Sequence, residues 1–120
     1  MAEQRIDLKQ LLHLIHDNKE FDVNFILDEG CVLYADDQKP LIKVLNYLIN
    51  YLTPLTSQPL EISLDLRGNG ILMSMMAYTD SSDLPAVSEQ VNDALKVYKA
   101  ELNLIHETGK YAQFKVSFSK

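Results

Sequence analysis

Residues 40–78 read PLIKVLNYLINYLTPLTSQPLEISLDLRGNGILMSMMAY and hold the strongest secondary-structure signals of the chain. Over Pro40–Leu52 the apolar residues recur at helical spacing, which predicts an amphipathic helix with one apolar face. That face consists of Leu41, Val44, Leu45, Leu48, Ile49 and Leu52. Because proline cannot continue a helix, Pro54 and Pro59 predict a loop before the next element.

A β-hairpin is expected after this loop. Apolar and polar residues alternate from Leu60 to Leu66, which is typical of a strand with one buried face. The turn residues Arg67-Gly68-Asn69-Gly70 then lead into the apolar run Ile71–Tyr78. Glycine and asparagine favour tight hairpin turns, so we expect the two runs to pair as antiparallel strands.

The N-terminal part predicts a helix and two strands. Residues 7–18 carry apolar side chains at helical spacing, and Asp7 is placed to accept from the free amides of the first turn. The apolar positions of this helix are Leu8, Leu11, Leu12 and Ile15. The period changes to two over Phe21–Leu27, and Cys31–Tyr34 offers a short second strand. A turn at residues 28–30 joins the two.

The C-terminal part predicts a third helix and a second hairpin. After a polar break at residues 79–83, the pattern predicts a helix over Pro85–Glu101, with its proline in the first turn. Strands over Leu102–His106 and Ala112–Phe118 then close the chain around the turn Thr108-Gly109-Lys110.

Three helices and about six strands predict an α+β fold in one domain over residues 1–120. We expect a two-layer sandwich in which the three helices pack on one face of a single mixed, largely antiparallel sheet. The other face of the sheet should be exposed to solvent. The tight hairpins exclude a doubly wound nucleotide-binding fold, whose strands are joined by helical crossovers.

Composition excludes several classes of function. The chain has 120 residues, with 17 acidic against 11 basic side chains and a net charge of −6, so no nucleic-acid partner is expected. Its 4 glycines form neither GxGxxG nor a Walker-type loop. The apolar runs are far below the roughly 18 residues of a membrane span, and the start lacks a signal segment. We therefore expect a cytoplasmic protein without a membrane partner, in which the single cysteine, Cys31, is a buried hydrophobe.

The order helix, strand pair, helix, hairpin, helix, hairpin resembles the ATP-binding domain of sensor histidine kinases. These domains belong to the Bergerat-fold superfamily, together with gyrase and mismatch-repair ATPases, and the resemblance covers nearly the whole chain. Ile6–Leu12 resembles the helix that opens such domains, and Phe21–Leu27 resembles their first strand. Ala35–Leu41 is similar to the approach to the family's key helix, which includes an aspartate.

The most specific local match is Asn46-Tyr47-Leu48-Ile49-Asn50, which resembles the NxxxN core of the family's asparagine box. In relatives that bind ATP, the second asparagine ligates a magnesium ion on the phosphates, so the resemblance assigns this role to Asn50. Helical spacing places Asn46 and Asn50 together, opposite the apolar face. Two polar residues on a solvated helix face are the alternative interpretation.

Asp80 and Lys110 are the other candidates for a nucleotide site. Asp80 aligns with the family's DxGxG aspartate, which accepts from the adenine amino group, but no glycine follows it. A loop or capping role is its alternative interpretation. The segment Glu107–Phe118 holds Lys110 and resembles the closing Gly-Lys-Gly-Thr hairpin, yet Tyr111 and Ala112 replace its second glycine and its threonine.

The family's flexible lid and GxGLGL box, whose amides hold the phosphates, have no counterpart, because no glycine occurs between Gly70 and Gly109. The resemblance therefore implies a degenerate domain that keeps the fold without catalytic residues or a cofactor. We expect a protein-interaction module in two-component-type signalling. Its expected partners are a receiver domain or another kinase module.

Two alternatives stay open from the sequence. The first is a weak, lidless site for ATP with magnesium, which would use Asn46, Asn50, Asp80 and Lys110, with the metal at Asn50. The second is a homodimer formed through the exposed sheet face or through the helix edge that carries Tyr47 and Tyr51, since aromatic residues suit interfaces.

Overall fold

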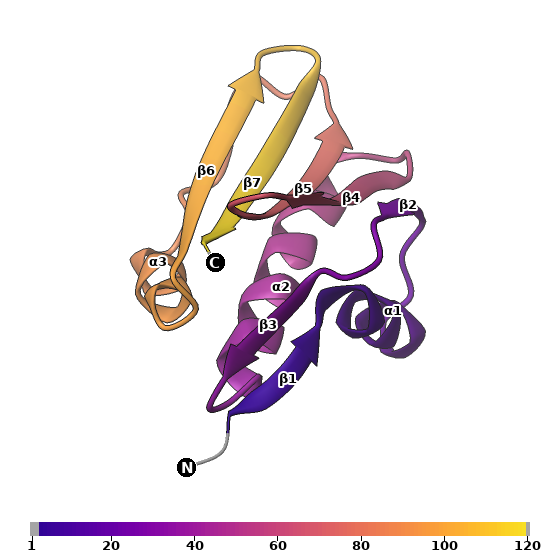
Figure 1. Ribbon diagram of the computed structural model, residues 1–120. Helices are drawn as coiled ribbons and strands as arrows, with labels where there is room; N and C mark the ends of the chain where they lie inside the picture. Colours follow the sequence, from indigo (N-terminus) through magenta and orange to yellow (C-terminus); the bar gives the residue numbers. More distant parts are fainter. Residues whose placement is uncertain (1–2, 120) are drawn as a thin grey trace.

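Alternating apolar residues along the strands create one sheet face that the helices cover (Figure 1). A computed structural model describes residues 3–119 of the chain. The strands within these residues are β1 (Gln4–Asp7), β2 (Val23–Leu27), β3 (Val32–Ala35), β4 (Leu60–Arg67), β5 (Gly70–Tyr78), β6 (Ala100–Glu107) and β7 (Tyr111–Ser119). The helices are α1 (Leu8–Asn18), α2 (Lys39–Leu52), α3 (Glu89–Lys96) and a 3-10 turn at Thr53–Leu55. None of these helices has the length and apolar run needed to cross a bilayer.

Five strands form the main sheet in the order β2-β4-β5-β7-β6. β2 lies parallel to β4, and every other neighbouring pair is antiparallel. Both predicted hairpins are confirmed, because β4 pairs with β5 and β6 pairs with β7. The sheet is therefore mixed and largely antiparallel, as the alternation and the turn residues predict.

The hydrophobic core lies between this sheet and the helices. Leu12 of α1, Leu48 of α2 and Leu95 of α3 belong to one buried cluster with Met75 and Phe114 of the sheet. The residues that alternate with the buried ones on β4, β5 and β7 are half-buried or exposed. The predicted α+β class, with helices on one face of a mixed sheet, is confirmed.

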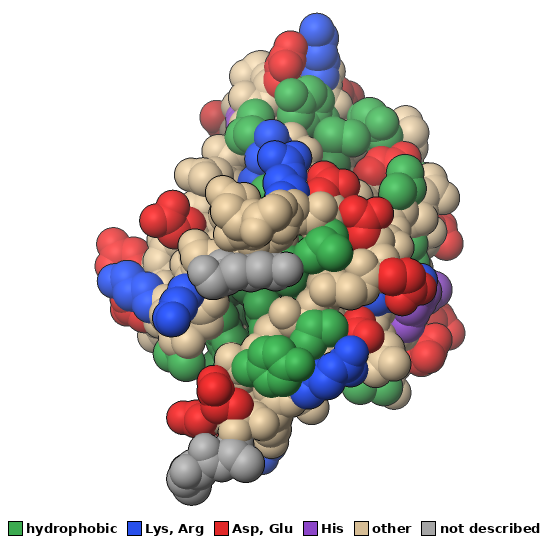
Figure 2. All heavy atoms as spheres, in the orientation of Figure 1, with side chains coloured by type: hydrophobic (Ala, Val, Ile, Leu, Met, Phe, Trp, Pro, Cys, Tyr) green, Lys and Arg blue, Asp and Glu red, His purple; other side chains and the backbone are tan. Residues whose placement is uncertain are grey.

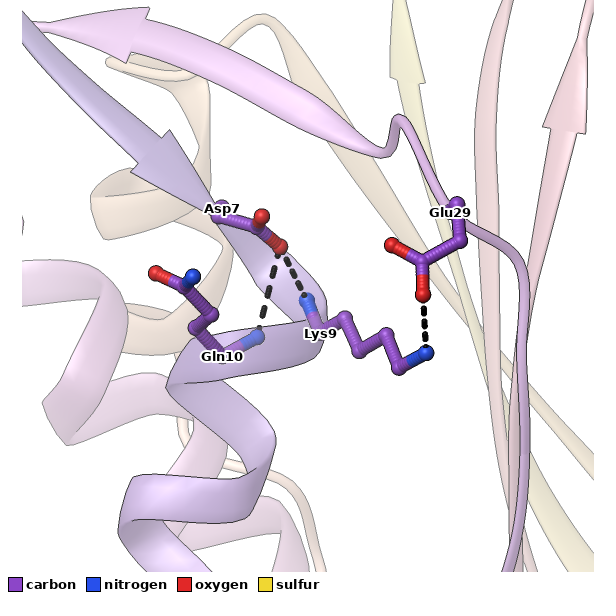
Figure 3. Close-up of polar contacts among 4 residues, drawn as sticks. All are labelled: Asp7, Lys9, Gln10 and Glu29. Atoms are coloured by element: carbon purple, nitrogen blue, oxygen red, sulfur yellow. Dashed lines mark hydrogen bonds and ion pairs between the residues drawn. The ribbon is translucent and has the colours of Figure 1, made fainter.

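Helix α1 begins where the sequence predicts, because Asp7 caps it (Figure 3). One carboxylate oxygen of Asp7 accepts from the amides of Lys9 at 3.0 Å and Gln10 at 3.3 Å. Such a cap satisfies amides that have no partner inside the helix and contributes about 1 kcal/mol. The Lys9 side chain pairs with Glu29, which ties the first turn of α1 to the loop after β2.

The predicted strand at Cys31–Tyr34 forms, but it does not join the main sheet. β3 instead pairs antiparallel with β1 in a separate two-stranded sheet, and the sequence analysis missed β1. β1 has only four residues and no alternation that could be recognised locally. Within residues 3–119, β2 is an edge strand of the main sheet and pairs with β4 alone, and the Asp28 amide continues that pairing by donating to the Leu64 carbonyl at 3.0 Å.

The predicted helix over Pro85–Glu101 is much shorter, because α3 begins only at Glu89 and ends at Lys96. Its start is set by the Ser88 side chain, which caps the first turn. Upstream, Leu84 and Val87 pack against the core from a segment that is not helical. Downstream, Lys99 has a positive φ of 55°, which a continuing helix does not allow. Tertiary contacts therefore override the favourable proline position.

Tyr98 fastens the end of α3 to the start of α2. Its hydroxyl accepts from the Leu41 amide at 3.1 Å and donates to the Asp37 carbonyl at 2.6 Å. The Leu41 amide is one of the first amides of α2, which have no partner within the helix. Burial raises the pKa of Tyr98, the hydrogen bond from Leu41 lowers it, and the charge of Asp37 raises it, with a net upward shift.

We expect Tyr98→Phe to lower the free energy of unfolding by about 2 kcal/mol at pH 8, because the variant leaves buried backbone groups unpaired. A raised pKa in the folded state means that the neutral hydroxyl stabilises the fold below the usual tyrosine pKa of about 10. That stability is lost as the pH rises through the raised pKa. Urea unfolding at pH 8 and pH 11 should show a smaller alkaline loss in Tyr98→Phe than in the wild type. An equal loss in both proteins contradicts this assignment.

Candidate functional site

The two asparagines of the candidate site lie on the flank of α2 that faces away from the core. Asn46 is half-buried, and its side-chain amide donates to the Ile42 carbonyl of the same helix at 3.1 Å. Asn50 is exposed, one turn further along. The amide group of Asn46 is thus used within α2, whereas Asn50 presents its side chain to solvent.

Residues 81–88, which we call the strap, are bound to α2 at Tyr47 and Tyr51, the residues that follow these asparagines in the sequence. The hydroxyl of Tyr51 donates to the Pro85 carbonyl at 2.5 Å, and the Ser88 amide donates to the hydroxyl of Tyr47 at 2.9 Å. At the other end of the strap, Nε2 of His106 lies 3.0 Å from the Ser81 carbonyl oxygen. Two tyrosines of α2 and one histidine of β6 therefore hold the strap at three points.

Tyr51 is enclosed by the strap and the sheet. Only 9% of its surface is exposed, and its ring meets that of Phe114 edge-on at 5.0 Å between centroids. Burial raises the pKa of Tyr51, and its neighbour Tyr47 raises it further. Of the two tyrosines at the homodimer edge that the sequence suggested, Tyr51 is covered by the chain itself, whereas Tyr47 is half-buried and lines a groove.

Asp80 and Lys110 lie together, apart from the asparagines. Both line a shallow hollow of about 470 Å³ with the loop after α2 and the turn before β7, and neither Asn46 nor Asn50 lines it. The amide of Thr79 donates to the Lys110 carbonyl at 3.0 Å, which fixes the two segments against each other. The Lys110 ammonium lies 3.2 Å from a Glu107 carboxylate oxygen in an exposed ion pair. The four predicted residues thus form two separate pairs.

A groove between α2 and α3, of about 510 Å³, was missed by the sequence analysis. Lys39 and Lys43 line it at one side, and Pro40, Val44, Val91 and the ring of Tyr47 supply apolar surface. The lysine pair at helical spacing on α2 was a signal that could have indicated a basic groove. Its chemistry suits a ligand with an apolar part and an acidic group.

Residues 3–119 contain no group of three or more histidine, cysteine, aspartate or glutamate side chains that could hold a metal ion. Asn50, the predicted magnesium ligand, has no carboxylate beside it on the flank formed by Asn46, Lys43 and Lys39.

Comparisons with known proteins place this geometry in a fold family. No family model and no curated protein matches the sequence. Among solved structures, the histidine kinase domain of the E. coli osmosensor EnvZ matches with a TM-score of 0.76 and 9% identity, covering 99% of this chain and 89% of that one. The Acinetobacter baumannii histidine kinase AdeS matches with a TM-score of 0.74 and 13% identity, covering 99% and 68%. Full-length ShkA in complex with AMPPNP matches with a TM-score of 0.74 and 11% identity, covering 100% and 32%. The chain therefore has the fold of the histidine-kinase ATPase domains.

Proposed function

We propose that this protein is a degenerate histidine-kinase-type ATPase domain that works as a protein-interaction module in two-component-type signalling. The observation that carries the proposal is the strap, which bonds to Tyr47 and Tyr51 of α2 and contains no glycine, although the resemblance implies the lid and the glycine-rich phosphate box in this part of the chain. In this proposal the domain acts in the cytoplasm, catalyses no phosphoryl transfer and holds no resident cofactor.

The strap lacks the glycine-lined amide cradle that the family uses to hold a polyphosphate. The Ser88 amide already donates to Tyr47, and no glycine lies between Gly70 and Gly109 to let the backbone approach a ligand closely. Each charge-assisted hydrogen bond to a phosphate contributes about 1.5–3 kcal/mol, so the loss of several removes most of the affinity. The net charge of −6 adds repulsion of an anionic ligand.

The interaction role follows from retention of the scaffold without its chemistry. The fold is shared with sensor kinases such as EnvZ and AdeS, whose signalling role is the basis for proposing a receiver domain or a kinase module as the partner. Because a fold supports many functions, this partner class is an analogy that binding must test. A receiver domain is the first partner to titrate against the full chain.

The second candidate function is weak binding of ATP with magnesium at the open flank of α2. It is favoured by the exposed Asn50 and by Lys39 and Lys43 on the same helix. A kinase of the same fold, ShkA, forms a complex with AMPPNP. Asp80 and Lys110 line a different hollow, so this site would lack the adenine contacts that the resemblance assigned to them.

Calorimetry with Mg-ATP and Mg-ADP at millimolar concentrations separates the two functions. We expect no saturable heat from the wild-type protein, because the phosphates have no cradle. Asn50→Ala tests the predicted magnesium ligand, and Asn92→Ala is its matched control, since Asn92 is another exposed helical asparagine. A saturable heat that Asn50→Ala abolishes and Asn92→Ala keeps would overturn the proposal in favour of the weak ATP site.

A further inference from the structure

A cleft of about 620 Å³ separates the two-stranded sheet from the turn between α3 and β6. One wall is formed by β3 and its flanking residues Gly30 and Asp36, and the other by Val97–Lys99 and Ser119. Figure 2, in which the two-stranded sheet lies at the bottom, shows hydrophobic side chains at the surface between this sheet and the α3 lobe. The cleft lies apart from the strap and from the hollow that holds Asp80.

The wall on the β3 side is the edge of a strand. Successive side chains of a strand point to opposite faces, so a hollow lined by the consecutive residues Val32–Asp36 must face the backbone edge. The amide of Leu8 donates to the Cys31 carbonyl at 2.9 Å, which makes their position in the ladder a hydrogen-bonded one. Since hydrogen-bonded and non-hydrogen-bonded pairs alternate, the pair Arg5–Tyr34 is non-hydrogen-bonded. The N–H and C=O of Tyr34 therefore point away from β1, into the cleft.

Within residues 3–119, β3 pairs with β1 alone; on this edge the Val32 amide donates to the Gly30 carbonyl at 3.0 Å, which leaves the backbone groups of Tyr34 for another strand. Unpaired strand edges are templates for the addition of another strand. The side chains at the rim favour such a contact, because Tyr34 is 63% exposed on one wall and Val97 is 67% exposed on the other. The cleft thus combines backbone donors and acceptors with apolar contacts on both sides.

We propose that the cleft binds an extended, basic peptide segment of a partner protein, which pairs with β3 as a third strand. Paired strands lie about 4.8 Å apart, so the occupant must enter the space between β3 and Val97–Lys99. In a second copy of this chain, β3 lies behind its own Val97–Lys99 segment, so the β3 edges of two copies cannot come within pairing distance. A single extended peptide segment is narrow enough to enter the cleft, whereas the edge of a folded sheet is not.

Charge selects the chemistry of the peptide. Glu3 and Asp36 line the cleft on the β3 side, against Lys99 on the opposite wall. The whole chain carries a net charge of −6, which attracts a cationic segment. A strand with alternating apolar and basic residues places its apolar side chains between Tyr34 and Val97 and its cationic ones near Glu3 and Asp36.

This inference rests on the interaction role under Proposed function and does not depend on the nucleotide question. The test is therefore separate from the Mg-ATP titration. If the peptide does not bind and Mg-ATP gives no heat, the proposal of a degenerate domain is supported and the proposal of a peptide-binding cleft is rejected. If the peptide binds and Mg-ATP also binds through Asn50, the peptide-binding cleft is supported and the proposed loss of nucleotide binding is rejected.

The experiment is a titration of the full chain with an acetylated and amidated Lys-Val-Thr-Val-Lys peptide, followed by amide proton–nitrogen NMR spectra. We expect shifts confined to the amides of Val32–Asp36 and Val97–Lys99, and slower hydrogen exchange at the Tyr34 amide. The control peptides carry glutamate in place of both lysines, or an N-methyl group on the central threonine. Both controls should bind at least about tenfold more weakly.

Two variants test the two walls. Val97→Lys removes the apolar contact and repels the peptide, and Leu14→Lys is its matched control on α1, where Leu14 is 52% exposed. Tyr34→Pro removes the donor that points into the cleft without removing a hydrogen bond to β1, a position where an edge strand tolerates proline. We expect about tenfold weaker binding for Val97→Lys and Tyr34→Pro, and unchanged binding for Leu14→Lys.

Three results would overturn the proposal. The first is no shift at millimolar peptide, and the second is a set of shifts centred away from the cleft. The third is equal binding of the acidic peptide or of Val97→Lys. Thermal unfolding of each variant is measured first, and because Val97 is exposed, Val97→Lys keeps the test decisive even if Tyr34→Pro destabilises β3.

Discussion

Gly70→Ala is expected to destabilise the protein by about 3 kcal/mol, because a side chain at this position collides with a neighbouring strand. A Cβ atom on Gly70 would lie 2.1 Å from the carbonyl oxygen of Phe118 and 3.2 Å from its carbonyl carbon. Both contacts are with backbone, so relief requires β5 and β7 to separate at the register pair Gly70–Ser119. The packing of Phe118, which is 2% exposed, would be disturbed with it.

Gly68→Ala is the matched control, since Gly68 lies in the same turn and a Cβ there meets nothing within 4 Å. Urea unfolding measures the free energy, and thermal unfolding the midpoint temperature, of both variants against the wild type. We expect the midpoint of thermal unfolding to fall by about 10 °C for Gly70→Ala and by little for Gly68→Ala. Similar values for the two alanine variants would show that the close approach of β5 to Phe118 is not what limits stability.

Tyr51→Ala is the second change with a large expected effect, because it removes both the ring and the anchor of the strap. Truncation of a large buried aromatic side chain costs about 3 kcal/mol or more, and here it leaves a cavity beside Phe114. The Pro85 carbonyl also loses its hydrogen-bond donor. We expect the amides of the strap to exchange faster with solvent, while those at the centre of β5 keep most of their protection.

Tyr51→Phe separates the two contributions, since it keeps the ring and loses only the hydroxyl. Its expected cost is about 1 kcal/mol, the usual contribution of one hydrogen bond. Native-state hydrogen exchange and urea unfolding measure both variants. Unchanged strap exchange in Tyr51→Ala would mean that Tyr47 and His106 hold the strap without this anchor.

Tyr51→Ala also distinguishes two reasons for the proposed loss of ATP binding. If the strap only covers the site, loosening it should restore a heat with Mg-ATP. If the amide cradle is missing, as we propose, Tyr51→Ala should bind Mg-ATP no better than the wild type. Calorimetry on the folded variant at low temperature decides between the two.

The candidate site was only partly predictable. Asn46 and Asn50 share one helix, so their common flank followed from helical spacing alone. Asp80 and Lys110 lie on separate loops, and the long-range pairing of β5 with β7, in which Tyr78 lies opposite Tyr111, brings them together. The groove lined by Lys39 and Lys43 forms between two helices whose packing no local pattern describes.

Most of the fold was determined by local periodicity. Apolar spacing of 3.6 residues identified α1 and α2, and alternation with turn glycines identified the hairpins around residues 67–70 and 108–110, because both signals lie within a few residues of the chain. These features needed no knowledge of the rest of the molecule, and they were enough for the α+β class.

Long-range packing decided the remainder. β1 pairs with β3 although α1 and β2 lie between them in the sequence, and strands of four residues are too short to predict such a pairing. Pro85 suits a helix start, yet α3 starts at Glu89 because the core binds Leu84 and Val87. Gly68 and Gly70 look alike in one turn, and only the structure shows that the second has a positive φ of 158° and lies against the backbone of Phe118. In each case the conformation is stabilised by contacts with residues that are distant in the sequence, so the neighbouring residues do not predict it.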